Sequence, residues 1–318
     1  RYWPQGVTPP RIGHNSDAMD HPMTQGAIKG FRTEEIDEAE ALKARAGYFA
    51  CVDLLDEILG DMLAMMQRDG LLDDTVIVYT SDHGEMAGEH GLWWKNTWHE
   101  SSARVPLIFS LPQQRQIQTQ NQPANQAAKR EITTPASLAD IFPTLCGLAG
   151  VDAPDTLDGV DLSPALRGEA CPALADRSGV ITENPTPRWG EGTDFRMLRS
   201  ERYKYVAFRT CPDLAFDLQE DPDEQHNLLA QPDLPAELAA TLAAMRQEIL
   251  HGFDFDEVEA KRKRQSADLK QRFPQRVEPR TPNQILLGDG RLVEADQALY
   301  YPEVLSTDPD LDFDDFSA

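Results

Sequence analysis

The chain has 318 residues, a formal net charge of −24 and a pI near 4.6. Because so acidic a surface repels phosphate groups, we expect neither nucleic acid nor an anionic membrane as a partner. The four cysteines form no Cys-x-x-Cys pair, and their irregular spacing favours reduced thiols over a disulfide framework. Reduced thiols favour the cytoplasm over the periplasm, although composition leaves the compartment open.

The first third of the chain contains a predicted loop, a long helix and a strand. Residues 1–33 carry prolines, glycines and polar side chains, which predicts a surface loop. Apolar residues then recur at helical spacing, which predicts a long helix with its N-cap at Thr33 and its end at Gly70. The run 75–80, TVIVYT, has no polar alternation, so we expect a strand of a parallel sheet buried on both faces.

The later part of the chain changes to shorter elements. Four short apolar runs predict an antiparallel sheet. They are residues 179–183, 194–199, 202–208 and 214–218. An amphipathic helix at 235–251 is expected to pack across that sheet.

A candidate metal site follows the strand at 75–80. In an open α/β sheet ligands collect at the carboxyl ends of strands, which is where Asp82 and His83 stand. A carboxylate suits Ca²⁺ or Mg²⁺, and an added imidazole also admits Mn²⁺ or Zn²⁺. Gly84 allows a sharp turn after the pair. Lys95 follows in the same loop and supplies a positive charge for an anionic group bound to that metal.

Asp82-His83-Gly84 alone has a second interpretation, an Asx-type turn with a surface histidine. What favours the metal site is the resemblance of the longer segment to a known family: the segment carries S-D-H-G at 81–84, G-E-H-G-L-W-W-K at 88–95, Glu100, and R-V-P-L-I at 104–108. This series resembles the second metal-binding motif of the formylglycine-dependent sulfatases of the alkaline phosphatase superfamily. Within that family the runs G-L-W-W-K and E-S-S-A-R-V-P-L are most similar to choline sulfatases and iduronate-sulfatase-like enzymes.

The resemblance covers most of residues 1–250. Its further segments are the predicted helix around 42–62, S-L-A-D-I-F-P-T-L-C at 137–146, L-D-G-V-D-L at 157–162 and D-P-D-E-Q-H-N-L at 221–228. It implies an α/β fold, an alkaline-phosphatase-like mixed sheet sandwiched by helices, in residues 1–178. We expect a smaller antiparallel α+β subdomain at 179–254 and a helical, acidic extension at 255–318.

The family's nucleophile motif, C/S-x-P-x-R, does not occur in this sequence. The nearest stretch, Val7-Thr8-Pro9-Pro10-Arg11, has a valine in the nucleophile position, and no Asp-Asp pair precedes it. We therefore expect the chain to be the C-terminal part of a longer polypeptide whose formylglycine lies upstream. Without that nucleophile, the chain alone is predicted to be inactive.

The resemblance implies roles for particular residues. Asp82 and His83 would hold one divalent metal, Ca²⁺ first, with Mg²⁺ or Mn²⁺ as alternatives. Lys95 would be catalytic and would bind the substrate, with Trp94 and His90 as further substrate contacts. Glu89, His90 and Glu100 are candidates for orienting the ligands through hydrogen bonds or, equally, for surface charges, and Arg104 for a structural ion pair.

The predicted function is hydrolysis of a small-molecule sulfate ester, either a small alkyl or a sugar sulfate. Two alternatives stay open: a phosphonate or phosphate ester hydrolase of the same superfamily, and a non-catalytic chain that binds a partner. The acidic, phenylalanine-containing segment 308–315 is a candidate contact in a homo-oligomer.

Overall fold

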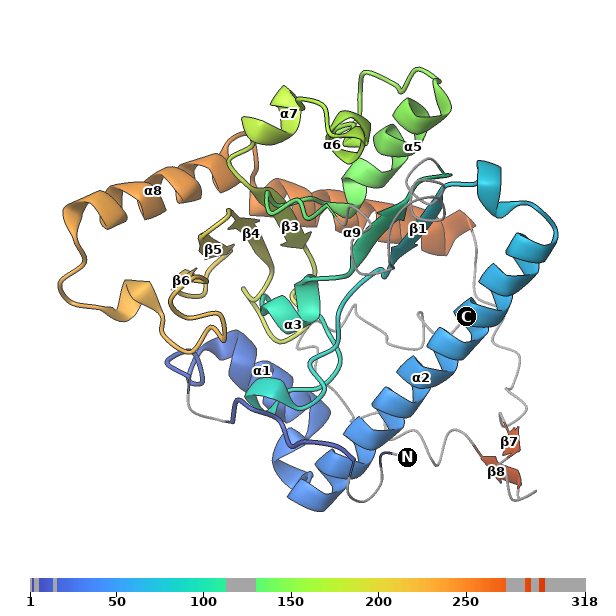
Figure 1. The fold of residues 1–318 in the computed structure, drawn as a ribbon. Helices are drawn as coiled ribbons and strands as arrows, with labels where there is room; N and C mark the ends of the chain where they lie inside the picture. Colours follow the sequence, from blue (N-terminus) through green and yellow to red (C-terminus); the bar gives the residue numbers. More distant parts are fainter. Residues whose placement is uncertain are drawn as a thin grey trace.

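The computed structural model describes residues 2, 6–13, 16–112 and 130–272, and the short strands at 284–286 and 292–294. Segment 308–315 lies outside the described residues. Figure 1 shows the arrangement of the elements. The α-helices are α1 (Pro22–Phe31), α2 (Glu38–Arg68), α3 (Glu100–Ala103), α5 (Ile141–Ala149), α6 (Ser163–Arg167), α7 (Pro172–Ala175), α8 (Ala236–Leu250) and α9 (Phe255–Arg272). The strands are β1 (Ile77–Thr80), β2 (Leu107–Ser110), β3 (Val180–Asn184), β4 (Phe195–Arg199), β5 (Tyr203–Phe208), β6 (Leu214–Asp217), β7 (Gln284–Leu286) and β8 (Leu292–Glu294).

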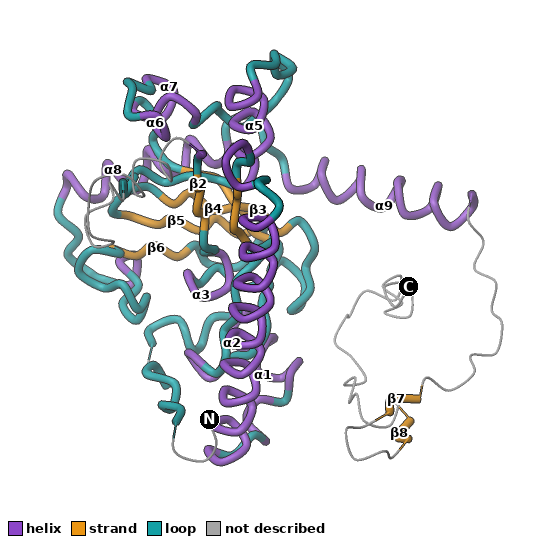
Figure 2. The backbone as a smooth tube through the Cα atoms, turned by 45° about the vertical axis from the view of Figure 1, so that its right-hand side comes forward, coloured by secondary structure: helices purple, strands orange, loops and turns teal. Residues whose placement is uncertain are grey.

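Strands β3 to β6 form an antiparallel sheet in sequence order (Figure 2). The four predicted strands and the predicted helix at 235–251 are confirmed. Because side chains alternate across a strand, the sheet has two apolar faces. The face toward α8 is formed by Leu198, Tyr205, Ala207 and Ala215, which pack with Leu242, Met245 and Ile249.

The opposite face of this sheet packs on segments from the first third of the chain. Met197, Val206 and Phe216 share one buried cluster with Met23 of α1 and Trp98 of the loop before α3. The core therefore continues across residue 178, where sequence patterns place a domain boundary. This shared core holds the loop between β1 and β2 against the sheet.

Strand β1 differs from its prediction. It pairs antiparallel with β2, with Ile77 opposite Ser110 and Thr80 opposite Leu107, and has no other strand partner among the described residues. All four of its residues are partly buried rather than fully buried. The expected parallel neighbours are therefore not found in the described part of the chain, although the strand and its end before Ser81 are as predicted.

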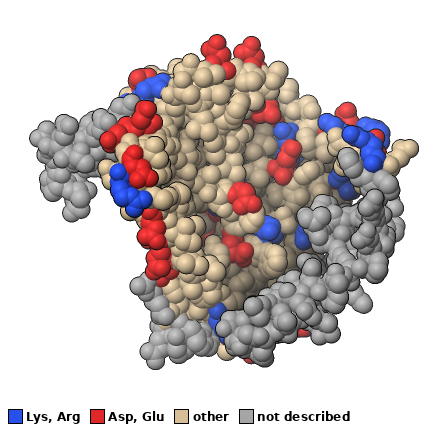
Figure 3. Space-filling model, turned by 90° about the vertical axis from the view of Figure 1, so that its right-hand side faces the viewer, with Lys and Arg blue, Asp and Glu red and all other residues tan. Residues whose placement is uncertain are grey.

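Helix α2 begins later than predicted. Its N-cap is Asp37, whose carboxylate accepts a hydrogen bond from the Glu40 amide at 2.8 Å, and the Glu40 side chain bonds back to the Asp37 amide. Thr33 instead starts a short 3-10 turn. The helix exposes apolar side chains, among them Leu54, Leu55 and Ile58. Figure 3 shows one face of the molecule, on which residues other than Lys, Arg, Asp and Glu predominate. Among the described residues, no helix combines the length and hydropathy needed to cross a lipid bilayer.

The surface loop expected at 1–33 is wrong for its second half, which contains α1. Met23 and Ala27 of this helix are fully buried, and His21 caps it by accepting a hydrogen bond from the Met23 amide. The His21 ring contacts Trp98 and Phe208, with centroids 5.3 and 4.5 Å away. Burial lowers the pKa of His21, which favours the neutral ring in this core.

Candidate active site

Asp82 and His83 follow β1 directly, and their side chains face each other. The Nε2 atom of His83 lies 3.4 Å from Oδ2 of Asp82. The Nδ1 atom of His83 lies 2.8 Å from the Gly84 carbonyl oxygen, so Nδ1 carries the proton that this hydrogen bond requires in a neutral ring. The Nε2 lone pair then points to the same side as the Asp82 carboxylate, which is the tautomer that a metal-binding histidine needs.

The backbone around the pair holds the turn in shape. The His83 amide donates to Oδ1 of Asp82 at 3.0 Å, and the Ser81 hydroxyl donates to the His83 carbonyl at 2.9 Å. The side chain of Asp82 is 83% exposed and that of His83 is 40% exposed, so both are accessible to a ligand. Desolvation raises the pKa of the Asp82 carboxyl, whereas the positive charge of a protonated His83 ring and these hydrogen bonds lower it, and the net shift is downward.

Gly84 is required by a close approach between two backbone segments. A Cβ atom at this position would lie 2.1 Å from the Ser101 carbonyl oxygen and 3.0 Å from that of Arg104. Its amide donates to the Ser102 carbonyl at 2.8 Å. The glycine therefore allows the turn to pack on α3, and its φ is not in the left-handed region that a special turn would demand.

The loop that carries Trp94 and Lys95 has an unusual backbone. Ala87, His90, Trp94 and Asn96 all have positive φ values, between 47° and 70°. A bulky residue such as Trp94 with a φ of 69° is strained, and such strain concentrates at functional sites. Two hydrogen bonds hold the conformation: the Trp94 amide donates to Oε1 of Glu85 at 2.6 Å, and the Trp94 carbonyl accepts from Met86 at 2.8 Å.

Trp94 and Lys95 lie together on the surface. The Trp94 side chain is 55% exposed, and its indole stacks on the Phe31 ring of α1 with centroids 5.9 Å apart. The Lys95 Nζ lies 5.5 Å from the centroid of the Trp94 indole. Glu85 connects Trp94 to the candidate ligands Asp82 and His83, because it lies three residues after Asp82 and accepts a hydrogen bond from the Trp94 amide.

His90 is placed differently from Trp94. It is 2% exposed, and its ring lies 4.2 Å from that of the buried His99, centroid to centroid. Desolvation lowers the pKa of His90 to about 4 and that of His99 well below its usual value. This burial argues against direct contact between His90 and a substrate.

Glu89 and Glu100 belong to structural networks. The Glu89 carboxylate accepts hydrogen bonds from the backbone amides of Arg11 and Ile12 at 2.9 and 3.0 Å. Glu100 forms an ion pair of 2.6 Å with Lys204 of β5. Arg104, expected in an ion pair, has an exposed side chain, and its charge contributes to lowering the pKa of Glu100.

Sequence reasoning missed Lys204 and Glu224. The Lys204 side chain is fully buried, and its Nζ also bonds Oε1 of Glu224 at 2.7 Å. Two signals were available, the lysine in the apolar run 202–208 and Glu224 within the segment D-P-D-E-Q-H-N-L at 221–228, but neither indicates that the two side chains meet.

The side chains of Asp82 and His83 are arranged as two ligands on one side of a metal coordination sphere would be. Two donor atoms converge and the second nitrogen of the imidazole is engaged by a carbonyl. Ca²⁺ takes about six to eight ligands. Among the described residues no group of three His, Cys, Asp or Glu side chains is arranged to bind a metal, so this pair supplies only part of such a shell.

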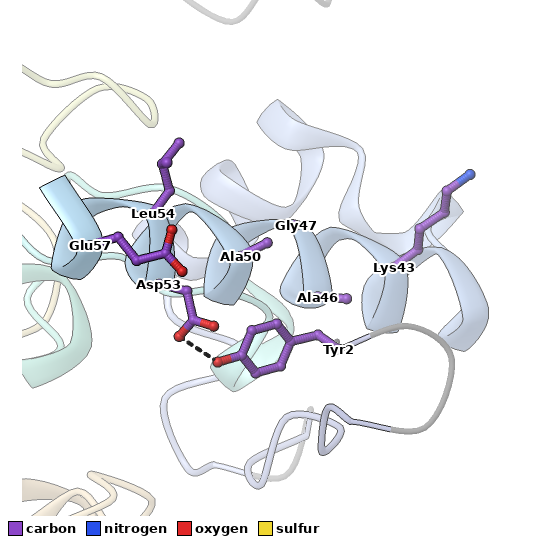
Figure 4. A pocket seen from close by; sticks show the side chains of 8 residues that line it. All are labelled: Tyr2, Lys43, Ala46, Gly47, Ala50, Asp53, Leu54 and Glu57. Atoms are coloured by element: carbon purple, nitrogen blue, oxygen red, sulfur yellow. Dashed lines mark hydrogen bonds between the residues drawn. The ribbon is translucent and has the colours of Figure 1, made fainter. Parts of the chain in front are cut away.

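A cavity of about 590 Å³ lies elsewhere, along α2 (Figure 4). The Tyr2 hydroxyl closes one side of it and donates to Asp53 at 2.8 Å. It is lined by Tyr2, Lys43, Ala46, Gly47, Ala50, Asp53, Leu54 and Glu57. The cavity shares no residue with the Asp82 and Lys95 segments, so we do not assign it to the candidate site.

The chain is similar to known proteins over most of the described residues. A model of the sulfatase family matches residues 15–151, and a model of the N-sulphoglucosamine sulphohydrolase C-terminal region matches residues 88–250. The chain is 34% identical to choline-sulfatase of Rhizobium meliloti over 221 residues, 68% of this chain and 39% of that protein. It is 31% identical to arylsulfatase K of Bos taurus over 226 residues, 67% of this chain and 38% of that protein.

A solved structure shares the fold. The phosphonate monoester hydrolase of Agrobacterium radiobacter superposes with a TM-score of 0.62 at 24% identity, over 90% of this chain and 54% of that one. The chain thus spans about two fifths of the length of its curated relatives. Its mixed α/β architecture is that of the alkaline phosphatase-like fold. On these matches, the chain belongs to the sulfatase family of the alkaline phosphatase superfamily.

Proposed function

We propose that the full-length protein hydrolyses a sulfate ester at a site to which this chain contributes Asp82, His83 and Lys95. The observation that carries the proposal is the convergence of the Asp82 carboxylate and the His83 Nε2 atom, with Nδ1 held by the Gly84 carbonyl. These two side chains would hold part of the shell of one divalent metal, Ca²⁺ first, with Mg²⁺ or Mn²⁺ as alternatives. Family membership supports the reaction class.

The metal, when bound, supplies Lewis-acid polarisation of the sulfuryl oxygens. The nucleophile that we propose is a formylglycine contributed by a part of the full-length protein outside this sequence. Asp82 and His83 would hold this ion, and the hydrogen bonds of the turn keep their donor atoms in place. Lys95 neutralises negative charge that develops on the transferred group or on the departing oxygen.

Trp94 favours a sugar sulfate over a choline-like substrate. Its exposed indole gives a ring face on which a sugar can stack, held in place by Phe31. The ammonium group of Lys95 lies 5.5 Å from the indole centroid, so a quaternary ammonium group at that face would meet a like charge. We therefore propose Trp94 as a contact for the alcohol part of a sugar sulfate.

Hydrolysis assays on the full-length protein test this function. We expect release of nitrophenol from 4-nitrophenyl sulfate in excess of that from 4-nitrophenyl phosphonate, and a fall in kcat of about a hundredfold or more in Lys95→Ala. The control is Lys261→Ala, an exposed lysine on α9 that no part of the proposed site uses. Faster phosphonate hydrolysis would assign the protein to the phosphonate ester hydrolases, and no hydrolysis of either ester would favour a non-catalytic binding role.

A further inference from the structure

Lys204 is the centre of a buried ion cluster that connects two distant parts of the chain. Its side chain is fully buried and its ammonium group has three partners. Nζ lies 2.6 Å from Oε1 of Glu100, 2.7 Å from Oε1 of Glu224 and 3.0 Å from the Trp98 carbonyl oxygen. An ammonium group has three protons to donate, so each of them has a partner.

Glu224 holds the same segment through its second oxygen. Its Oε2 atom accepts a hydrogen bond of 2.6 Å from the backbone amide of Glu100, the first residue of α3. The Glu224 side chain is 2% exposed, and its backbone φ of 53° is in the left-handed region. A buried carboxylate with both oxygens engaged and a strained backbone indicates a position that the surrounding structure strongly determines.

The segment that Lys204 and Glu224 hold is the one that packs on the turn carrying the candidate ligands Asp82 and His83. Helix α3 and the residues before it are held at Trp98 and Glu100. Two residues after Glu100, the Ser102 carbonyl accepts a hydrogen bond from the Gly84 amide at 2.8 Å, and the Ser101 carbonyl oxygen would lie 2.1 Å from a Gly84 Cβ. The Gly84 carbonyl oxygen in turn accepts a hydrogen bond from Nδ1 of His83. A continuous series of contacts thus runs from Lys204 to the imidazole without touching a substrate.

We propose that Lys204 and Glu224 are positioning residues for the candidate site, because they fix α3 and α3 fixes the turn that carries Asp82 and His83. The inference rests on the proposed function, since it assigns the buried cluster to the geometry of those two ligands. Metal and transfer sites require their ligands to be held within about 0.5 Å, which a rigid supporting layer provides. A buried charge cluster is a poor source of stability compared with apolar packing, so a geometric role gives a reason for its presence here.

The test compares two carboxylate-to-amide variants of the full-length protein. Glu224→Gln removes the charge that pairs with Lys204 and weakens the hydrogen bond to the Glu100 amide at the start of α3. Asp213→Asn is the matched control, because Asp213 is also largely buried and bonds Arg246, Tyr205 and the Phe208 amide on the other side of the sheet. The two readouts are hydrogen exchange of the Gly84 amide and Ca²⁺ affinity measured by calorimetry.

We expect Glu224→Gln to speed exchange at Gly84 by about tenfold and to weaken Ca²⁺ binding by about tenfold, the lower end of the effect of removing a supporting partner. Asp213→Asn should change neither by more than about twofold. If Glu224→Gln does not fold, Glu100→Gln serves in its place, because it keeps the backbone bond to Glu224 and removes only one partner of Lys204.

A folded variant with exchange at Gly84 equal to that of the control would overturn the positioning role, whatever the activity. Failure of the proposed function has a different signature. In that case the unmodified protein would bind no Ca²⁺ and hydrolyse no sulfate ester, while faster exchange at Gly84 in Glu224→Gln would still show that the cluster holds the turn.

Discussion

The amide of Gly84 donates a hydrogen bond of 2.8 Å to the carbonyl oxygen of Ser102, and the two backbones approach so closely that a side chain at residue 84 has no space. This contact joins the strand end that carries the candidate ligands to the short helix α3. The position of Asp82 and His83 therefore depends on residues more than a hundred positions later in the chain, through Lys204 and Glu224.

Replacing Gly84 by alanine should damage both stability and the site. The new Cβ would meet the Ser101 carbonyl at 2.1 Å, so one backbone segment must shift, which we expect to cost about 1–3 kcal/mol of unfolding free energy. Gly60→Ala in α2 is the control, since nothing lies within 4 Å of its Cβ position and helix propensity should add about 0.5–1 kcal/mol. Denaturant melts of the full-length variants measure both changes. A free energy of unfolding for Gly84→Ala equal to that of the unmodified protein would show that the close approach is absent.

Trp94→Gly should separate substrate binding from folding. Glycine adopts a φ of 69° without strain, so the melting temperature should hold or rise, while loss of the indole raises the KM for N-acetylglucosamine 6-sulfate by about tenfold. The matched control is Phe142→Ala on α5, which removes a ring of nearly the same exposure, 54% against 55%. A larger loss with choline sulfate than with the sugar sulfate would reverse the proposed specificity.

Asp140 should contribute to stability and not to the chemistry. It is fully buried, and its carboxylate accepts hydrogen bonds of 2.7 Å from both terminal nitrogens of Arg177. It also accepts hydrogen bonds from the backbone amides of Ser137 and Val160. Despite desolvation, these bonds lower the pKa of Asp140, so its contribution is present above its unfolded pKa and is lost as the pH falls below that value.

Asp140→Ala leaves Arg177 without its buried partner, and we expect a loss of about 3–5 kcal/mol. The exposed Asp158→Ala serves as the comparison. The measurements are a denaturant melt and the Ca²⁺ affinity of the folded fraction. A stable Asp140→Ala protein with weakened metal binding would assign Asp140 to the site instead.

The buried histidines should make the protein less stable in mild acid. Burial lowers the pKa of His90 to about 4, whereas the unfolded chain titrates near about 6.5. Between the two pKa values the unfolded chain binds a proton at His90 and the folded protein does not. The free energy of unfolding is therefore at its full value above a pH of about 6.5 and declines as the pH falls toward 4. His90 alone accounts for on the order of 3 kcal/mol of this decline.

Melting temperatures between pH 7.5 and 4.5 check this prediction. His90→Gln should flatten the decline, while the exposed His251→Gln should leave it as in the unmodified protein. Parallel curves for all three proteins would mean that the pKa of His90 is the same in the folded and unfolded states.

The elements that the sequence predicts correctly are those with a regular local pattern of apolar residues. The four strands between 180 and 217 and helix α8 each have a continuous periodicity and clear boundaries. Helix α1 was missed because Pro22, Gly26 and Gly30 suggest a loop, whereas burial of Met23 and Ala27 in the core stabilises the helix. The start of α2 was placed at Thr33 although Asp37 and Glu40 have the capping-box spacing.

The candidate site was predictable only in part, for a physical reason. Asp82 and His83 are adjacent in sequence, so their proximity follows from the strand end that precedes them. The Glu100 and Glu224 contact joins residues 124 positions apart, and no local pattern contains that information. The burial of His90 likewise follows from tertiary packing against His99, which the motif G-E-H-G does not show.

Calorimetric titration of the full-length protein with Ca²⁺ tests the central claim most directly, namely that Asp82 and His83 are metal ligands. We predict one site in the unmodified protein and a loss of affinity of about a hundredfold in Asp82→Asn, because a charged oxygen donor is replaced by an amide. Asp73→Asn, an exposed carboxylate before β1, should bind as the unmodified protein does. Equal affinities in Asp82→Asn and the unmodified protein would contradict the assignment.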